Sequence, residues 1–299
     1  MTTTNHQNQF TYISLGYRCS TAGILKRLGL KHESFPFDWM ISRLPIIKHC
    51  IETRFAYFID PKWYVKKQTH TTHYHKGTTP VPMKICDETI YENVHYANLY
   101  QDQTQDQTPK TMNIPQPLSR ENGDTYAHLL AINHRNIHDP ETQAYYARCI
   151  DRFFHYWEPT TPTPTPVVGI YIHPTITEKE YQDQTNDLQQ EFRELYEKTM
   201  PKHWSAVFFI IVRTNHPYPI TDHIPDCLQL LYTDTQQHTT EPQTTDTTPP
   251  TDKNQTPTRN IRIYVVYTNR DFVDAGEIFM HNPYIEIDKI MGVGELRSP

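Results

Sequence analysis

The stretch ISLGYRCSTAGILKRLGL, Ile13 to Leu30, decides how the first part of the chain folds. With the apolar residues just before it, its start predicts a buried strand over residues 10–16, which stops at Gly16. Apolar residues three and four apart then predict a short helix over residues 21–30. Cys19 lies between these two elements. It is either a nucleophile set at the start of a helix or a buried thiol of an ordinary α/β core.

Beyond this stretch, apolar strands alternate with amphipathic helices. Strands are expected over residues 126–134, 167–172, 206–212, 228–233 and 261–268, and helices over residues 44–55, 140–157 and 178–200. Several strands are continuously apolar, which indicates burial on both faces, as in a parallel sheet that helices cover. We therefore expect residues 1–299 to form a single three-layer α/β domain with a mostly parallel, Rossmann-like sheet.

Side chains that can cap a helix mark the expected helix starts. They are Ser20 or Thr21 for the first helix, Ser42 for the second, Asp139 followed by Pro140 for the third, and Thr177 with Glu180, a capping box, for the fourth. A capping side chain accepts a hydrogen bond from an N–H group that would otherwise lack a partner in the first turn.

Three polar tracts lack the apolar side chains that a core needs. Residues 1–9 are expected to be a loose N-terminus, and residues 101–120, which include the repeat QDQTQDQT, a surface insertion. A second insertion, rich in Thr, Gln and Pro, is expected over residues 235–260. The core is therefore expected to come from the segments between these tracts.

The composition excludes several classes of protein. A formal net charge of −6 argues against a nucleic-acid-binding protein, whose binding domain is usually basic. No run of about 18 apolar residues occurs, so no membrane span is expected, and no signal peptide is visible. The five cysteines are widely spaced without a CxxC pair, so we expect reduced thiols in the cytoplasm. Nothing in the sequence indicates an oligomeric state.

The junction at Cys19 has features that activate a thiol. Sites in open α/β sheets lie beyond the carboxyl ends of strands. The N–H groups and the positive dipole at a helix start favour a thiolate and can hold a developing oxyanion, and Arg18 adds a positive charge. The alternative is that Gly16 only forms a tight turn and that Cys19 is buried and inert.

A cysteine nucleophile needs a general base, most often a histidine. His134 ends an expected strand, which places it at the same sheet edge as Cys19 if the strands are parallel. His138 and His95 are alternative bases. Asp139, next to His138, is expected to cap a helix and not to take part in catalysis.

A second group of histidines occurs in the segment HTTHYH. It consists of His70, His73 and His75. This spacing fits no common zinc motif, and a closed zinc site needs four ordered ligands. We therefore expect neither a metal site nor a cofactor.

The segment FPFDWM, Phe35 to Met40, places one carboxylate among aromatic side chains and a proline. Such an acid is either well hydrogen-bonded or strongly shifted in pKa. Asp38 could therefore orient a histidine, or it could hold the loop by accepting hydrogen bonds from backbone N–H groups.

Two segments resemble the DUF1796 family, which is described as a family of papain-like cysteine peptidases. In the first segment the matching residues are Ser14, Leu15, Gly16 and Cys19, the helical residues 25–30, and Pro36, Phe37, Asp38 and Trp39. The second segment is similar to family members from large DNA viruses, and its matching residues are His134, Tyr146, Arg148, Cys149, Arg152 and Phe153.

The resemblance implies acyl transfer by a Cys–His pair on a protein or peptide substrate, and it makes a papain-like α+β fold the alternative architecture. The first hypothesis is therefore a thiol hydrolase with Cys19 as nucleophile, His134 as base and Asp38 as orienting group or loop anchor. The residues expected to support this site are Ser14, Gly16, Arg18 and Trp39.

Two other functions are compatible with the sequence. A non-catalytic structural or interaction protein, such as a virion component, would keep the same scaffold, and the Thr/Gln/Pro tracts suit surface display. A glycan-processing protein would use the polar rim of a buried parallel sheet, an idea that rests on analogy between folds.

Overall fold

The computed structural model describes residues 10–17, 19–67, 71–74, 84–87, 90–96, 130–133, 135–161, 165–173, 176–213, 228–236 and 259–268. Outside them lie residues 1–9, residues 101–120, most of the tract 235–260, Arg18 and His134.

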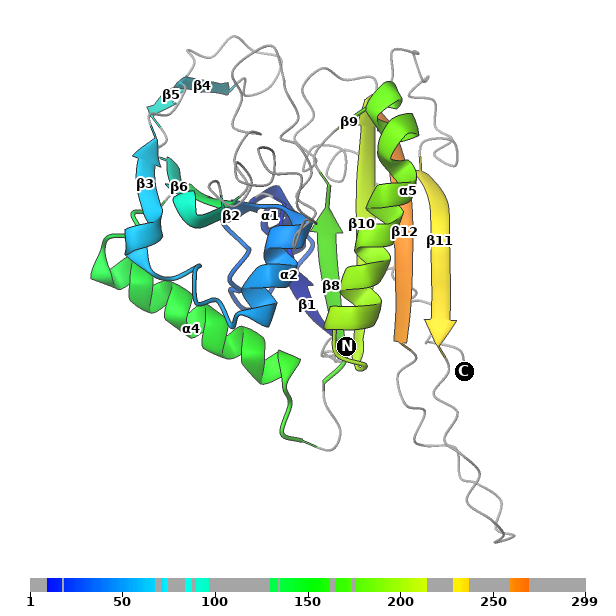
Figure 1. Cartoon of the computed structure of the whole chain (residues 1–299), viewed down its shortest axis with the longest axis horizontal. Helices are drawn as coiled ribbons and strands as arrows, with labels where there is room; N and C mark the ends of the chain where they lie inside the picture. Colours follow the sequence, from blue (N-terminus) through cyan, green and yellow to red (C-terminus); the bar gives the residue numbers. More distant parts are fainter. Residues whose placement is uncertain are drawn as a thin grey trace, which may run out of the picture.

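A six-stranded, mostly parallel sheet contains the most apolar strands. Its strands are β1 (Thr11–Ser14), β8 (Val167–Ile172), β9 (Ile176–Thr177), β10 (Trp204–Arg213), β11 (Leu228–Gln236) and β12 (Arg259–Thr268). They lie in the order β1-β8-β10-β12-β11, with β9 beside β10 (Figure 1). β1, β8, β10 and β12 are parallel neighbours, and β11 is antiparallel to β12. The four parallel strands follow their order in the chain, so they form no reversal point of the kind at which doubly wound sheets bind nucleotides.

Helices pack on both faces of this sheet. They are α1 (Cys19–Arg27), α2 (Leu44–Glu52), α4 (Pro140–Trp157) and α5 (Glu178–Glu194), which continues into the π-helical turn η3 (Leu195–Thr199); a short 3₁₀ turn, η1, spans Pro61–Trp63. α1 packs Leu25 against the face that carries Ile170. α2 and α5 pack Ile47 and Phe192 against the face that carries Tyr171. None of the helices in the described part of the chain has the length and apolar character needed to span a membrane.

A second, antiparallel sheet departs from the expectation of one parallel sheet. Its strands are β2 (Met40–Ser42), β7 (Leu130–Asn133), β6 (Ile90–Asn93) and β3 (Tyr64–Lys67), in that order, and β4 (Thr71–Tyr74) and β5 (Lys84–Asp87) form a separate pair. The expected strand over residues 126–134 corresponds to β7 of this sheet, so the parallel pairing on which the expected position of His134 depended is not observed. A short apolar run does not specify its partner strand, and β2 is too short to show a period.

Two expected helix starts are confirmed. Thr177 and Glu180 form a capping box: the Thr177 hydroxyl accepts from the Glu180 N–H at 3.2 Å, and the Glu180 carboxylate accepts from the Thr177 N–H at 2.7 Å. Asp139 is the N-cap of α4 and Pro140 its first residue. The Asp139 side chain, however, accepts from the Asn136 amide and makes no hydrogen bond to the first turn of the helix.

Two other helix starts differ from the expectation. α1 begins at Cys19, which is therefore the first helical residue and not the residue before the helix. Thr21 does not cap this helix, because its hydroxyl donates to the Gly16 carbonyl at 2.7 Å. Ser42 belongs to β2, and the N-cap of α2 is Arg43, whose side chain does not cap the helix.

Strands take up both ends of the expected Thr/Gln/Pro insertion. β11 extends to Gln236, and β12 begins at Arg259. Gln236 and Arg259 pair with each other in the antiparallel ladder of β11 and β12.

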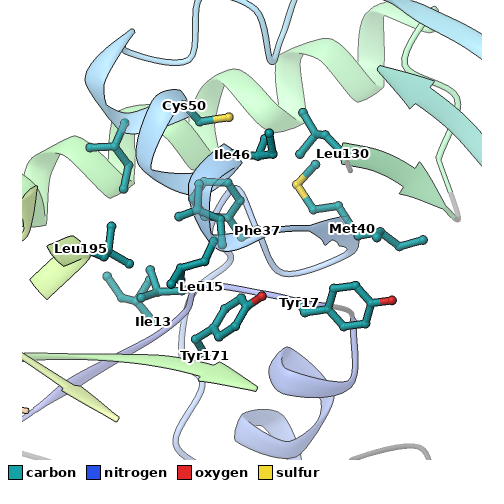
Figure 2. Close-up of a cluster of buried hydrophobic side chains, with 14 of the residues drawn as sticks. Ile13, Leu15, Tyr17, Phe37, Met40, Ile46, Cys50, Leu130, Tyr171 and Leu195 are labelled. Carbon is teal, nitrogen blue, oxygen red and sulfur yellow. The ribbon is translucent and has the colours of Figure 1, made fainter. Parts of the chain in front are cut away.

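The aromatic side chains of the segment FPFDWM pack into the core. The Phe37 ring lies 5.4 Å from the Phe55 ring and 6.4 Å from the Phe153 ring of α4, between centroids. Figure 2 shows Phe37 in one cluster with Leu15 and Met40. This packing fixes the loop that carries the expected Asp38.

Candidate functional site

The loop between β1 and α1 is held in place by β8. The Leu15 N–H donates to the Ile170 carbonyl at 2.8 Å, so the pairing of β1 with β8 continues beyond the last residue of β1. Ile172 and Tyr17 extend it further, because the Tyr17 N–H donates to the Ile172 carbonyl and the Ile172 N–H donates to the Gly16 carbonyl, both at 3.3 Å. The loop therefore starts at the carboxyl edge of the parallel sheet, where sites of α/β proteins form.

Gly16 makes the tight turn that the sequence predicts. Its φ is +103°, a conformation that side chains rarely adopt, and a Cβ atom at this position would lie 2.2 Å from the Ser42 Oγ. The Gly16 N–H donates to the buried Ser14 hydroxyl at 3.3 Å, and its carbonyl accepts from Thr21. Ser14 and Gly16 thus fix the direction in which the chain enters α1.

The same loop joins the two sheets. The Ser42 N–H of β2 donates to the Tyr17 carbonyl at 2.9 Å. The guanidinium of the buried Arg43 lies 5.1 Å from the centre of the Tyr17 ring. The start of α1 is therefore positioned by contacts from both sheets.

Cys19 differs from the other thiols that the structure describes. Cys19 is half-buried at the first position of α1, whereas Cys50 and Cys149 are buried. Burial raises the pKa of the Cys50 thiol to about 12, and burial also raises the pKa of Cys149. These two thiols stay protonated at neutral pH. Of the three, only Cys19 combines partial exposure with a helix N-terminus. Arg18, expected to add a positive charge beside it, lies outside the described residues.

Asp38 anchors a loop in this structure. Its Oδ2 accepts from the Phe35 N–H at 2.7 Å and forms an ion pair with the Lys31 ammonium. Burial raises the pKa of Asp38, and the charge and hydrogen bond of Lys31 oppose this effect. The Asp38 Oδ1 is buried and has no hydrogen-bond partner among the described residues. Of the two roles expected for Asp38, these contacts show the loop anchor, and the neighbouring Trp39 is half-buried.

The anchor lies at the far end of α1 from Cys19. Lys31 follows the last turn of α1, and its N–H donates to the Leu25 carbonyl of this turn at 3.1 Å. A nine-residue helix is about 13 Å long, so the Lys31–Asp38 pair holds the end of α1 opposite to Cys19. The structure therefore does not bring Asp38 into contact with the thiol.

α4 makes polar contacts with the two residues just before the segment FPFDWM. The Arg152 guanidinium forms an ion pair with Glu33 at 3.2 Å and donates to the Ser34 carbonyl. The Tyr156 hydroxyl donates to Glu33 at 2.9 Å. The two segments that resemble the family, far apart in the sequence, are thus packed against each other.

The two alternative bases lie beside the antiparallel sheet. The half-buried His95 ring stacks on Tyr57, with centroids 4.0 Å apart and planes within 6°. Burial, together with the nearby His49 ring, lowers the pKa of His95. His138 is exposed and its ring contacts Tyr91 at 5.6 Å. Both rings therefore pack against residues in or next to the antiparallel sheet.

β7 leads away from the loop at Cys19. Leu130, its first residue, pairs with Ser42, whose N–H contacts Tyr17. Asn133, its last described residue, lies three residues further along, a distance of about 10 Å. His134 follows Asn133 in the chain and lies outside the described residues.

His173 is a histidine that sequence reasoning missed at this edge. It follows β8 directly, is buried, and its N–H donates to the Phe209 carbonyl at 2.7 Å. The signal was present in the segment VVGIYIH, where a histidine ends a continuously apolar strand. This is the same pattern that singled out His134, but β8, unlike β7, is the direct parallel neighbour of β1.

Metal binding finds no support in the part of the chain that the structure describes. There, no group of three or more His, Cys, Asp or Glu side chains is arranged to hold a metal ion. The side chains of His70, His73 and His75 lie outside it.

Comparison with known proteins identifies a family. A family model described as "Putative papain-like cysteine peptidase (DUF1796)" matches residues 10–212, more than half of the chain. The match includes β1, Cys19, the segment FPFDWM, α4 and β8. No curated protein and no solved structure matches the chain. The chain, with a mixed α/β fold built on a mostly parallel and an antiparallel sheet, therefore belongs to the DUF1796 family.

Proposed function

We propose that this protein is a cysteine hydrolase that cleaves peptide bonds with Cys19 as its nucleophile. The observation that carries the proposal is the position of this thiol, half-buried at the first residue of α1 and beyond the carboxyl end of β1. A helix N-terminus favours the thiolate, which is the nucleophilic form of cysteine. The family description supports a cysteine peptidase, and the net charge of −6 supports a peptide substrate over a nucleic acid.

The reaction would follow two steps of acyl transfer. The Cys19 thiolate attacks the carbonyl carbon and forms a C–S bond; the C–N bond breaks as a histidine gives a proton to the leaving amine. Water, deprotonated by the same histidine, then cleaves the acyl-enzyme and restores the thiol. The Gly16 and Tyr17 N–H groups already donate to Ser14 and Ile172, so the first turn of α1 would stabilise the oxyanion.

The histidine expected from the sequence is His134, with His138 and His95 as alternatives. His134 follows β7, which pairs with β2 immediately after the segment FPFDWM. In the proposed site, Asp38 acts as the anchor of that segment. Its contacts with Lys31 and with the backbone support this role.

We further propose a single three-layer, Rossmann-like domain for residues 1–299, with the tracts 101–120 and 235–260 as surface insertions and residues 1–9 outside the core. Helices on both faces of the parallel sheet support the three layers. We propose a cytoplasmic location, because the described cysteines Cys19, Cys50 and Cys149 are thiols without a disulfide.

The test is cleavage of a peptide library. The protein is incubated with a complex mixture of peptides whose N-termini are blocked, and newly formed N-termini are identified by mass spectrometry. We expect cleavage by the wild type and by Cys149→Ala, which removes a buried thiol, and none by Cys19→Ala. Equal cleavage by Cys19→Ala would contradict the proposal. A folded wild type that cleaves nothing would favour the non-catalytic alternative.

A further inference from the structure

The parallel pairing of β1 with β8 places His173 beside the loop that leads to Cys19. The hydrogen bonds of Gly16 and Tyr17 to Ile172 put the end of β8 next to this loop. His173 is the next residue, and its backbone is fixed by the N–H donated to Phe209 on β10. The position of its Cα atom is therefore determined by two neighbouring strands of the sheet.

The register of β1 and β8 limits the separation between the two residues, because its continuation from Ser14 and Ile170 places Tyr17 opposite His173. Neighbouring strands lie about 4.8 Å apart, and each residue adds at most about 3.8 Å along the chain. Cys19 lies two residues beyond Tyr17, so the Cα atoms of Cys19 and His173 lie within about 12 Å of each other.

The two side chains approach the edge of the sheet from opposite faces. The His173 ring lies 6.4 Å from the Tyr171 ring and 6.4 Å from the Phe192 ring of α5, on the face that α5 covers. α1, which starts with Cys19, packs against the other face. Figure 2 shows Tyr171 and Tyr17 projecting into the core from β8 and from the loop. A group bound over the ends of β1 and β8 would therefore lie between the thiol and the imidazole.

We infer that His173 is the general base of Cys19. This inference rests on the proposed function, and it assigns the role that the sequence gave to His134. The imidazole takes the proton of the thiol through one water molecule between them, so that a thiolate and an imidazolium form. The imidazolium then gives this proton to the leaving amine as the C–N bond breaks. In the second step the imidazole takes a proton from water and returns it to the thiol, so the cycle consumes only water.

The first experiment measures how the alkylation of Cys19 depends on pH. Iodoacetamide modification is followed by peptide mapping and mass spectrometry in the wild type, in His173→Gln, in His134→Gln and in the control His155→Gln, which changes an exposed ring on α4. An ordinary thiol gives a midpoint near pH 8.5, and a histidine-paired thiolate a midpoint lower by one unit or more. We expect a low midpoint in the wild type and in His155→Gln, and a rise of at least one unit in His173→Gln.

The possible outcomes separate this inference from the proposed function. A low midpoint that only His134→Gln raises would overturn the role of His173 and leave Cys19 as nucleophile. A midpoint near pH 8.5 in the wild type would overturn both. A low midpoint that His173→Gln leaves unchanged would also exclude His173 as the base.

A second experiment leaves the buried His173 unchanged and so does not depend on the folding of a variant. The exchange of its ring C2–H into D₂O is followed against pH by peptide mass spectrometry, with Cys19 as a thiol or blocked as a methyl disulfide. Removing the thiolate withdraws the charge that stabilises the imidazolium, so blocking should lower the midpoint of the His173 profile by about one pH unit. Identical profiles before and after blocking would overturn the inference.

Discussion

Replacing Gly16 by alanine should destabilise the fold by about 2 to 5 kcal/mol, through two separate costs. The φ of +103° is unfavourable for a residue with a Cβ atom, which costs about 1 to 2 kcal/mol. The new Cβ would also lie 2.2 Å from the Ser42 Oγ, and relieving such an overlap in a packed core costs about 1 to 3 kcal/mol. Urea unfolding at 25 °C, followed by tryptophan fluorescence, measures the sum.

Two other glycines of the same region separate these costs. Gly29 has a φ of +70° but no atom within 4 Å of the added Cβ, so Gly29→Ala should show only the conformational cost of about 1 to 2 kcal/mol. Gly23 lies inside α1, also with no atom within 4 Å, so Gly23→Ala should stabilise the protein by about 0.5 to 1 kcal/mol.

The overlap itself can be removed from the other side. Ser42→Ala deletes the Oγ, which has no hydrogen-bond partner among the described residues, so alone it should cost little. Combined with Gly16→Ala, it should recover about 1 to 3 kcal/mol of the loss. The reasoning is refuted if Gly16→Ala costs no more than Gly29→Ala, or if the double variant is no more stable than Gly16→Ala.

Three further changes test the contacts around the site by the same unfolding measurement. Glu191→Gln should stabilise the protein by about 1 to 3 kcal/mol at pH 8 and leave its stability unchanged at pH 4. Burial raises the pKa of Glu191 from 4.5 to about 7. The wild type therefore loses stability as the pH rises through 7, and the glutamine variant does not. Thr177→Ala, which removes one half of the capping box with Glu180, should cost about 1 kcal/mol, and an unchanged midpoint would contradict it. Asp38→Asn should cost about 3 to 5 kcal/mol by leaving the Lys31 ammonium without its carboxylate, and Asp38→Asn with Lys31→Met should cost less than the sum of the two single changes.

The strand, turn and helix around Cys19 could be predicted from the sequence because the signals are local. An apolar run and a glycine define the turn at Gly16, and helical spacing defines α1. The start of α1 was harder to place, because Thr21 has the side chain of an N-cap but donates its hydroxyl back to the Gly16 carbonyl. Such a contact depends on the conformation of the turn, which spacing alone does not reveal.

The partner of each strand could not be predicted in the same way. β8 and β7 are both apolar runs that end next to a histidine, His173 and His134, yet β8 pairs with β1 and β7 pairs with β2. β2 is three residues long, which is too short for an alternation of apolar and polar residues to predict a strand. The premise that the strand before His134 belongs to the parallel sheet failed for this reason, and His173 was overlooked.

Asp38 shows how far the sequence can predict the role of a buried carboxylate. A carboxylate among aromatic residues predicts strong hydrogen bonds or a shifted pKa, and the structure has both. The choice between a histidine and a backbone partner depends on the turn that Phe35 and Asp38 make and on the reach of Lys31 from α1.

The reactivity of the five cysteines at pH 6 tests the central claim most directly. One sample of the folded protein and one sample unfolded in urea are each treated with limiting iodoacetamide. Each labelled cysteine is then identified by peptide mapping. We predict that Cys19 reacts first in the folded protein, because it starts α1, while burial keeps the Cys50 and Cys149 thiols protonated. In urea this preference should disappear. A folded protein in which Cys19 reacts no faster than it does in urea would contradict the claim that Cys19 is a nucleophile.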